Sequence, residues 1–93
     1  IFSLTSMSMT VIDVRSKDEW NTGYLEGALH IEWHDILQIS TQISKDEQIY
    51  LYCRSGNRSE KATKILLEAG FINAKNAGSI NEASKLLGIE IIN

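Results

Sequence analysis

The chain has 93 residues, of which 43% are hydrophobic and 23% are charged, and its formal net charge is −3. These values are typical of one globular domain that is able to bury a core. The negative net charge argues against a general affinity for nucleic acid, and a single cysteine excludes a disulfide within the chain. The sequence has no metal-ligand cluster, P-loop or GxGxxG motif, so we expect neither a metal nor another cofactor.

Residues 1–9 are apolar or small and carry no charge. They are too few to span a membrane, and the end of a signal peptide, an edge strand and an expression remnant all fit them. We therefore divide the chain into an N-terminal extension at residues 1–9 and a domain at residues 10–93.

The first predicted strand covers residues 10–14, and its surprising member is Asp13. A carboxylate in a buried strand needs a partner, because burying it unpaired is costly. Arg15 lies two positions along, on the same face of the strand, and is one candidate. Backbone amides are the other.

A short helix and a second strand follow. Ser16 and Glu19 have the spacing of a capping box, and Gly23 is expected to end the helix. Residues 27–31 then form a strand, and residues 33–40 outline another short helix against the sheet.

His30 and His34 are four residues apart, a spacing that fits a metal site on a helix or a cysteine–histidine pair. No third metal ligand is evident nearby. We therefore expect structural or surface roles for both.

Residues 49–52 are a short apolar run without alternation, which is typical of a strand buried on both faces of a parallel sheet. Residues 53–58 follow as a polar loop that holds one glycine. From about residue 58 the apolar residues recur with helical spacing, and Gly70 supplies the stop. A strand, a tight loop and a helix start in this order point backbone N–H groups at one spot.

Cys53 stands at the edge of this predicted anion cradle. The helix start, the loop amides and the guanidiniums of Arg54 and Arg58 are all close to it in sequence, and such neighbours lower the pKa of a thiol. We therefore interpret Cys53 as a thiolate nucleophile, with a small buried hydrophobe as the alternative. The hypothesis fails if the loop amides face elsewhere and Cys53 is sealed off from solvent.

The last third of the chain predicts a strand at residues 71–74 and a turn at residues 76–79. A final helix follows, with Asn81 as its cap and Gly88 as its stop. The tail at residues 88–93 is expected to cover the core with its isoleucines. Strands that alternate with short helices predict an α/β domain with a mainly parallel sheet.

The segment at residues 53–59, Cys-Arg-Ser-Gly-Asn-Arg-Ser, resembles the active-site loop of the single-domain rhodaneses, which carry sulfur as a cysteine persulfide. Residues 11–31 resemble the amino-terminal signature of that family, and residues 70–78 resemble the segment after its catalytic helix. The short length and the ending are similar to the phage-shock protein E type. The resemblance implies a rhodanese-like three-layer domain, with helices flanking a mainly parallel central sheet.

The resemblance also implies a thiosulfate sulfurtransferase. Cys53 would take the outer sulfur of thiosulfate or a similar donor and release sulfite. It would then pass the sulfur to cyanide or a thiol, in a two-step covalent scheme. The amides of residues 54–58 would stabilise the anionic sulfur, as an oxyanion hole does in acyl transfer.

The predicted site consists of catalytic Cys53, a set of substrate-binding residues and two supporting residues, Asp13 and Arg15, on the first strand. The substrate-binding residues are Arg54, Ser55, Gly56, Asn57, Arg58 and Ser59. Two alternatives stay open within this set. Arg58 could pair with an acid instead of the donor, and Ser59 could cap the helix.

Other functions of a reactive cysteine fit the residues less well. Tyrosine phosphatases need an arginine at the position that Ser59 occupies, and Arg58 falls one residue short. Thioredoxin chemistry needs a second cysteine where this chain has Ser55 and Gly56. A persulfide carrier that serves a partner protein without rapid turnover remains open beside the enzyme.

We expect a monomer that meets a small anionic sulfur donor and a thiol or cyanide acceptor, with no nucleic acid and no membrane span. The phage-shock-type resemblance points to the bacterial periplasm, and the sequence leaves the cytoplasm open. Ser79 departs from the paired glycines that are usual in the family, which leaves the choice of acceptor open.

Overall fold

The computed structural model of the chain describes residues 9–93. In chain order its elements are β1 (Met9–Asp13), α1 (Lys17–Trp20), β2 (Tyr24–Leu25), β3 (Leu29–His30), the 3-10 helix η1 (Trp33–Thr41), β4 (Gln48–Cys53), α2 (Asn57–Glu68), β5 (Ala74–Ser79), α3 (Ile80–Leu87) and β6 (Ile91–Ile92). The extension expected at residues 1–9 lies outside the described residues, except for Met9, which begins β1. None of the described helices is long and apolar enough to cross a membrane.

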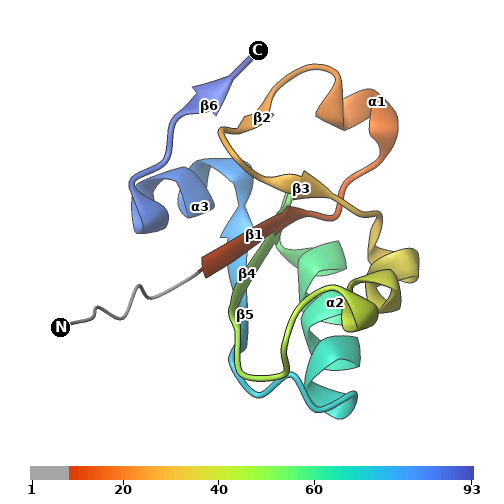
Figure 1. Cartoon of the computed structure of the whole chain (residues 1–93). Helices are drawn as coiled ribbons and strands as arrows, with labels where there is room; N and C mark the ends of the chain where they lie inside the picture. The colour runs from red at the N-terminus through yellow and green to blue at the C-terminus, as the bar shows by residue number, and fades with distance from the viewer. Residues whose placement is uncertain (1–8) are drawn as a thin grey trace, which may run out of the picture.

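Four parallel strands form the main sheet, in the order β3-β1-β4-β5 (Figure 1). β4 lies inside the sheet, between β1 and β5, as its unbroken apolar run predicts. Its last residue, Cys53, is paired with Ser79 of β5, and Tyr52 is paired with Asp13 of β1. The carboxyl ends of neighbouring strands therefore meet around Cys53, at the edge where open α/β sheets bind ligands.

Helices cover both faces of this sheet. On one face, α2 and η1 pack over the larger buried cluster, which includes Ile12, Leu51 and Leu66. On the other face, α3 packs over a smaller cluster that includes Leu25 and Ala83. Figure 1 shows α2 and α3 on opposite sides of the strands. The predicted three-layer α/β architecture with a mainly parallel sheet is confirmed.

The first helix begins where its sequence signal places it. Ser16 caps α1, and a full capping box with Glu19 is present. The helix ends at Trp20, before Gly23, with Asn21 as its C-cap. The amide of Gly23 donates to the Trp20 carbonyl at 3.1 Å, so the chain has left the helix before it reaches the glycine.

The prediction for the segment after α2 is wrong in its boundaries. We expect a strand at residues 71–74 and a turn at residues 76–79, but β5 occupies the second of these segments. Phe71 is fully buried, and its amide donates to the Leu66 carbonyl at 3.0 Å, so it closes the end of α2. β5 reaches further because it pairs with β4 as far as Cys53, with a register shift along the way.

The end of the chain is partly as predicted. Ser79 caps α3, so the prediction that Asn81 is the cap is wrong, and Gly88 ends the helix with a φ of 68°, as predicted. β6 pairs with β2 in a separate two-stranded antiparallel sheet. Ile89 of the tail packs against the smaller cluster, whereas Ile91 is 39% exposed and does not cover the core.

Candidate active site

Cys53 is the last residue of β4, and residues 54–56 connect it to α2. The amide N–H of Gly56 donates to Sγ of Cys53 at 3.0 Å. The residue itself is fully buried, with 0% of its surface exposed. The hypothesis of a reactive thiol fails if Cys53 is sealed off from solvent and the loop amides also face elsewhere. Cys53 is sealed off in this structure, but the Gly56 amide faces the sulfur, so the hypothesis stands.

The surroundings of Cys53 change the pKa of its thiol in opposite directions. Burial raises the pKa, because the thiolate loses its contact with water. Hydrogen bonds lower it, first from the Ser59 hydroxyl and then from the backbone at Ser59, Ser55 and Gly56. The net result is a pKa below the ordinary value of a cysteine, which increases the thiolate fraction at neutral pH.

The start of α2 has no side chain among residues 9–93 that caps its backbone donors. Gly56 is the N-cap residue, with a φ of 93°, and within the described chain no side chain caps this helix. Amide groups at a helix start without a cap favour an anion. Asn57, one of the predicted substrate-binding residues, is the exposed first residue of the helix, and Ser55 is also exposed.

Gly56 is needed because its φ of 93° is in the left-handed region, where a residue with a Cβ is strained. A Cβ at this position would lie 3.4 Å from the Cα of Gly78, which is ordinary van der Waals contact. The close approach of these two backbones keeps the loop folded against the end of β5.

Ser59 lies inside the first turn of α2, so the alternative that it caps the helix is not what the structure shows. The residue is fully buried. Its Oγ is 3.4 Å from Sγ of Cys53, and it donates to Oδ1 of Asn76 at 2.6 Å. The structure therefore brings Ser59 to the sulfur, as the sequence predicts for the substrate-binding set.

Asn76 is a site residue that sequence reasoning missed. It lies on β5, where we expected a turn, and its Nδ2 donates to the carbonyl of Gly56 at 3.0 Å. Asn76 could have been found as a polar residue on the strand that pairs with β4. That signal depends on the register between β4 and β5, which includes a shift between Leu51 and Tyr52 and is not readable from the sequence.

Arg58 is held by an acid, which is the alternative left open for it. Its Nη1 and Nη2 donate to Oε1 and Oε2 of Glu19 at 2.7 and 3.0 Å. This two-pronged geometry is the strong form of a guanidinium–carboxylate pair. It links α2 to α1, and the hydrogen bond from Arg58 lowers the pKa of Glu19 to about 2.

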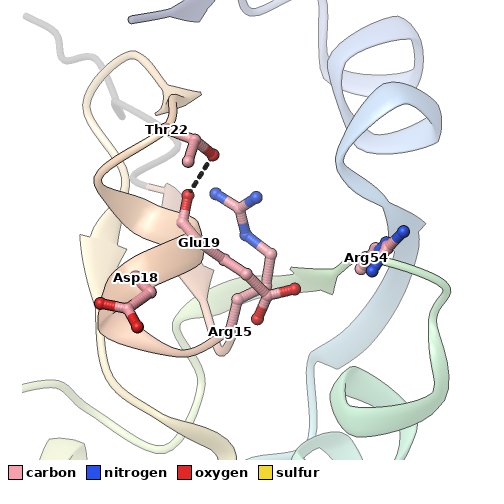
Figure 2. Close-up of a pocket in the computed structure, with 5 residues that line it drawn as sticks. All are labelled: Arg15, Asp18, Glu19, Thr22 and Arg54. Atoms are coloured by element: carbon pink, nitrogen blue, oxygen red, sulfur yellow. Dashed lines mark hydrogen bonds between the residues drawn. The ribbon is translucent and has the colours of Figure 1, made fainter.

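Arg54 follows Cys53 directly in the chain and is exposed. It lines a pocket of about 380 Å³ together with Arg15, Asp18, Glu19 and Thr22 (Figure 2). Arg15 and Glu19 already have ion-pair partners, whereas no described residue pairs with Arg54. The Arg54 guanidinium is therefore available to an anion that enters the pocket.

Asp13 and Arg15 form the buried pair that the sequence indicates. Nη2 of Arg15 lies 2.6 Å from Oδ2 of Asp13, and the backbone amide of Arg15 also donates to this carboxylate at 2.9 Å. The same Nη2 donates to the Gly23 carbonyl at 2.6 Å, and His30 donates to the Arg15 carbonyl at 2.7 Å. Through Gly23, the pair therefore links the end of β1 to the segment that carries the pocket residues Asp18, Glu19 and Thr22.

The two histidines do not come together in one site. The ring of His30 stacks on Trp20 with 5.1 Å between centroids, while His34 is exposed beside Glu32 and Asp35. Among residues 9–93 no group of three or more potential metal ligands occurs.

Residues 4–85 match the family model of the rhodanese-like domain. The chain is 35% identical over 91 residues to the adenylyltransferase and sulfurtransferase UBA4 of Lodderomyces elongisporus, covering 86% of this chain and 20% of that protein. It is 31% identical over 77 residues to thiosulfate sulfurtransferase 16, chloroplastic, of Arabidopsis thaliana, covering 70% of this chain and 64% of that protein.

Among solved structures, the fold is similar to a rhodanese with anions from E. coli, with a TM-score of 0.75 and 26% identity. The similarity covers 81% of this chain and 91% of that one. The chain spans about a fifth of the length of UBA4, at 20%, so the similarity to that protein concerns one part of it. With the family model matched across most of its length, this chain belongs to the rhodanese-like domain family.

Proposed function

We propose that the chain moves a sulfane sulfur from thiosulfate or a similar donor to cyanide or a thiol, through a persulfide on Cys53. Family membership and relatives named as sulfurtransferases support sulfur transfer in general. The observation that carries the specific proposal is the hydrogen bond from the Gly56 amide to Sγ at 3.0 Å. It marks this sulfur as the atom on which negative charge is stabilised.

The proposed reaction has two displacement steps at sulfur. In the first, the Cys53 thiolate attacks the outer sulfur of thiosulfate. A bond from Sγ to that sulfur forms, the bond between the two thiosulfate sulfurs breaks, and sulfite leaves with the electron pair. In the second, the acceptor attacks the outer sulfur of the persulfide, and the electron pair of the broken S–S bond returns to Sγ. The thiolate is restored without an external oxidant or reductant.

Arg54 is the residue that we expect to attract the donor. It is exposed, it follows Cys53 directly, and it lines the pocket of about 380 Å³. Arg58 is occupied by Glu19 and supports the loop from the side. The similar rhodanese from E. coli was solved with anions, which agrees with an anionic donor for this chain.

The burial of Cys53 adds a requirement to the proposal. Because none of its surface is exposed, Arg54 and Ser55, which precede Gly56 in the bend, have to shift before the outer sulfur of a donor can contact Sγ. Arg54 and Ser55 are exposed, so this movement breaks few buried contacts. Short glycine-containing loops with exposed side chains belong to the parts of a protein that open most easily.

A persulfide carrier that passes sulfur to a partner protein is the second candidate. The match to one part of a larger relative, 20% of its length, favours it. Steady-state assay with thiosulfate and cyanide separates the two, because a carrier forms the persulfide and turns over slowly.

Intact-mass measurement after thiosulfate treatment tests the proposal. We expect a gain of about 32 Da, one sulfur atom, that is lost on adding cyanide, as a covalent intermediate requires. Cys53→Ser is the control and gains no mass. If wild-type protein shows no such gain at any thiosulfate concentration, the proposal is wrong.

A further inference from the structure

The side chain of Asn76 connects the end of β5 to both the loop and the first turn of α2. Its Nδ2 donates to the Gly56 carbonyl at 3.0 Å, and its Oδ1 accepts from the Gly78 amide at 2.9 Å. Oδ1 also accepts from the Ser59 hydroxyl at 2.6 Å. One exposed amide group therefore touches three segments that surround the catalytic sulfur.

These contacts fix the orientation of the Asn76 amide. The Gly78 N–H can only donate and the Gly56 carbonyl can only accept, so oxygen and nitrogen cannot be exchanged without losing both bonds. Oδ1 is thus turned towards Ser59. Because Oδ1 has no proton to give, the Ser59 hydroxyl is the donor in that contact.

Ser59 has a single hydroxyl proton and two neighbours that could receive it. The contact with Asn76 is 2.6 Å long, against 3.4 Å to Sγ of Cys53. In this arrangement the proton points to Asn76 and an oxygen lone pair faces the sulfur, which suits an S–H donor. When Cys53 is a thiolate, the hydroxyl can turn to the sulfur only by giving up Asn76.

Asn76 also fixes the Gly56 amide, whose N–H faces Sγ both when Cys53 is a thiol and when it is a thiolate. The Gly56 carbonyl receives Nδ2 of Asn76 at 3.0 Å and the Glu60 amide at 3.0 Å. The N–H of the same residue donates to Sγ. A carbonyl fixed from two sides leaves the preceding backbone little freedom, so the N–H stays aimed at the sulfur.

We propose that Asn76 is a positioning residue that sets the ionisation and reactivity of Cys53, by fixing the Gly56 backbone and by holding the Ser59 proton. It acts through these two residues and makes no contact with the reacting atoms itself. The ionisation of Cys53 can be measured without any sulfur donor. The inference can therefore be judged even if the proposed reaction is wrong.

Several charged groups lie on the elements that meet at the carboxyl edge of the sheet. They are Arg54 from the loop, Arg58 from α2, Asp13 and Arg15 from β1, Glu19 from α1 and Glu82 from α3. All of them remain in the variants below. A difference between variants therefore reports the change at Asn76.

The test compares Asn76→Asp with a matched control, Asn73→Asp. The aspartate at 76 holds the Ser59 proton more strongly because its acceptor is charged, it loses the donor to Gly56, and it adds a negative charge; each of these changes disfavours the thiolate. Asn73 donates to the Asp46 carbonyl at 3.0 Å and precedes β5, at the end of the strand opposite to Cys53. N73D therefore makes the same chemical change away from the sulfur.

We measure the rate of iodoacetamide alkylation of Cys53 against pH in both variants. N76D should raise the apparent pKa by about one unit, as a nearby like charge does, while N73D leaves it at the wild-type value. Persulfide formation by N76D should be about tenfold slower at a pH below both apparent pKa values and recover at higher pH, as a shift of one unit requires. An unchanged apparent pKa in N76D overturns the inference, and so does slow persulfide formation that does not recover.

A neutral variant guards against loss of folding in N76D. Asn76→Gln displaces the amide by one methylene and adds no charge, so it should still raise the apparent pKa, by less than N76D does. In a Ser59→Ala background the effect of N76D should shrink, because part of it acts through that hydroxyl. Full additivity of the two substitutions contradicts the role assigned to Ser59.

Discussion

Two strands end side by side at the carboxyl edge of the sheet, and each leads into a helix, yet the two junctions satisfy their backbone groups differently. At the end of β5, Ser79 and Glu82 form a capping box: the Glu82 amide donates to Ser79 Oγ at 3.1 Å, and the Ser79 amide donates to Glu82 Oε1 at 2.9 Å. At the end of β4 the cap residue is Gly56, and no side chain in the described part of the chain takes that place.

This difference indicates which of the two junctions takes part in the reaction. The first amides of a helix need acceptors, and at α3 the chain supplies them from its own side chains. At α2 the acceptor is Sγ of Cys53, which the Gly56 amide reaches at 3.0 Å. The junction without a cap is therefore the one prepared to hold negative charge on sulfur.

Replacing Gly56, the N-cap residue of α2, should have the largest effect on the reaction. Gly56→Ala strains a backbone held at a φ of 93°, and relief of this strain moves the amide away from Sγ. We expect the rate of persulfide formation to fall by about 100-fold, the usual result of losing one preorganised donor. Rapid-quench mass spectrometry measures it.

Gly27→Ala is the control for Gly56→Ala. Gly27 has a φ of 84°, and a Cβ added there would meet nothing within 4 Å. The substitution therefore brings a similar backbone strain of about 1–2 kcal/mol without a contact to the sulfur. Both variants should lose comparable stability. If both also form the persulfide at the wild-type rate, the Gly56 amide has no part in the reaction.

The second-largest effect is expected from Arg54, and it concerns KM for thiosulfate. Arg54→Ala should raise KM for thiosulfate by about tenfold, because the pocket loses the charge that attracts the anion, while the reaction of preformed persulfide with a neutral thiol keeps its rate. Lys64→Ala, on the exposed side of α2, is the control for net charge. An equal rise in KM for both variants would show that only the overall charge matters.

A smaller effect is expected at the junction that caps itself. Ser79→Ala removes the side-chain acceptor of the α3 cap and should lower the free energy of unfolding by about 1 kcal/mol. The rate of persulfide formation should stay unchanged, because the hydrogen bonds of Ser79 in this cap go to Glu82 and not to the sulfur or the loop. Urea unfolding measures the free energy of unfolding, and single-turnover kinetics measure the rate of persulfide formation. A slowed reaction with unchanged stability would reverse the assignment of the two junctions.

The smallest effect belongs to the ion pair beside the loop. The Arg58 hydrogen bond lowers the pKa of folded Glu19 to about 2, so the pair stabilises the protein above the unfolded value of about 4.5 and loses this contribution as pH falls from there to about 2. Glu19→Gln should lower the free energy of unfolding at pH 7 by at most about 1 kcal/mol. Chemical unfolding of both proteins between pH 7 and 2 should show the difference shrinking; a constant difference contradicts it.

The local signals in the sequence predicted the parts of this site that depend on neighbouring residues. The apolar run of β4, the loop after Cys53 and the capping box at Ser16 all rest on contacts a few residues apart. The carboxylate of Asp13 found its predicted partner in Arg15, two residues along. Such contacts are fixed by the geometry of one strand or one helical turn.

Contacts across long stretches of chain were the ones that sequence reasoning missed. The sequence left open that Arg58 pairs with an acid but did not identify Glu19, 39 residues away, and it did not predict the contact of Asn76 with Gly56, 20 residues away. Both depend on how α1 and β5 are placed against the loop. The position of β5 depends in turn on pairing with β4, which overrides the turn signal in its own residues.

The pH dependence of Cys53 alkylation in the wild-type protein tests the central claim most directly. The rate should be measured where it is first order in iodoacetamide, so that opening of the loop is not limiting. The hydrogen bond from the Gly56 amide to Sγ at 3.0 Å predicts an apparent pKa below the value of about 8.5 for a free thiol. An apparent pKa at or above 8.5 would contradict a thiolate held by the loop.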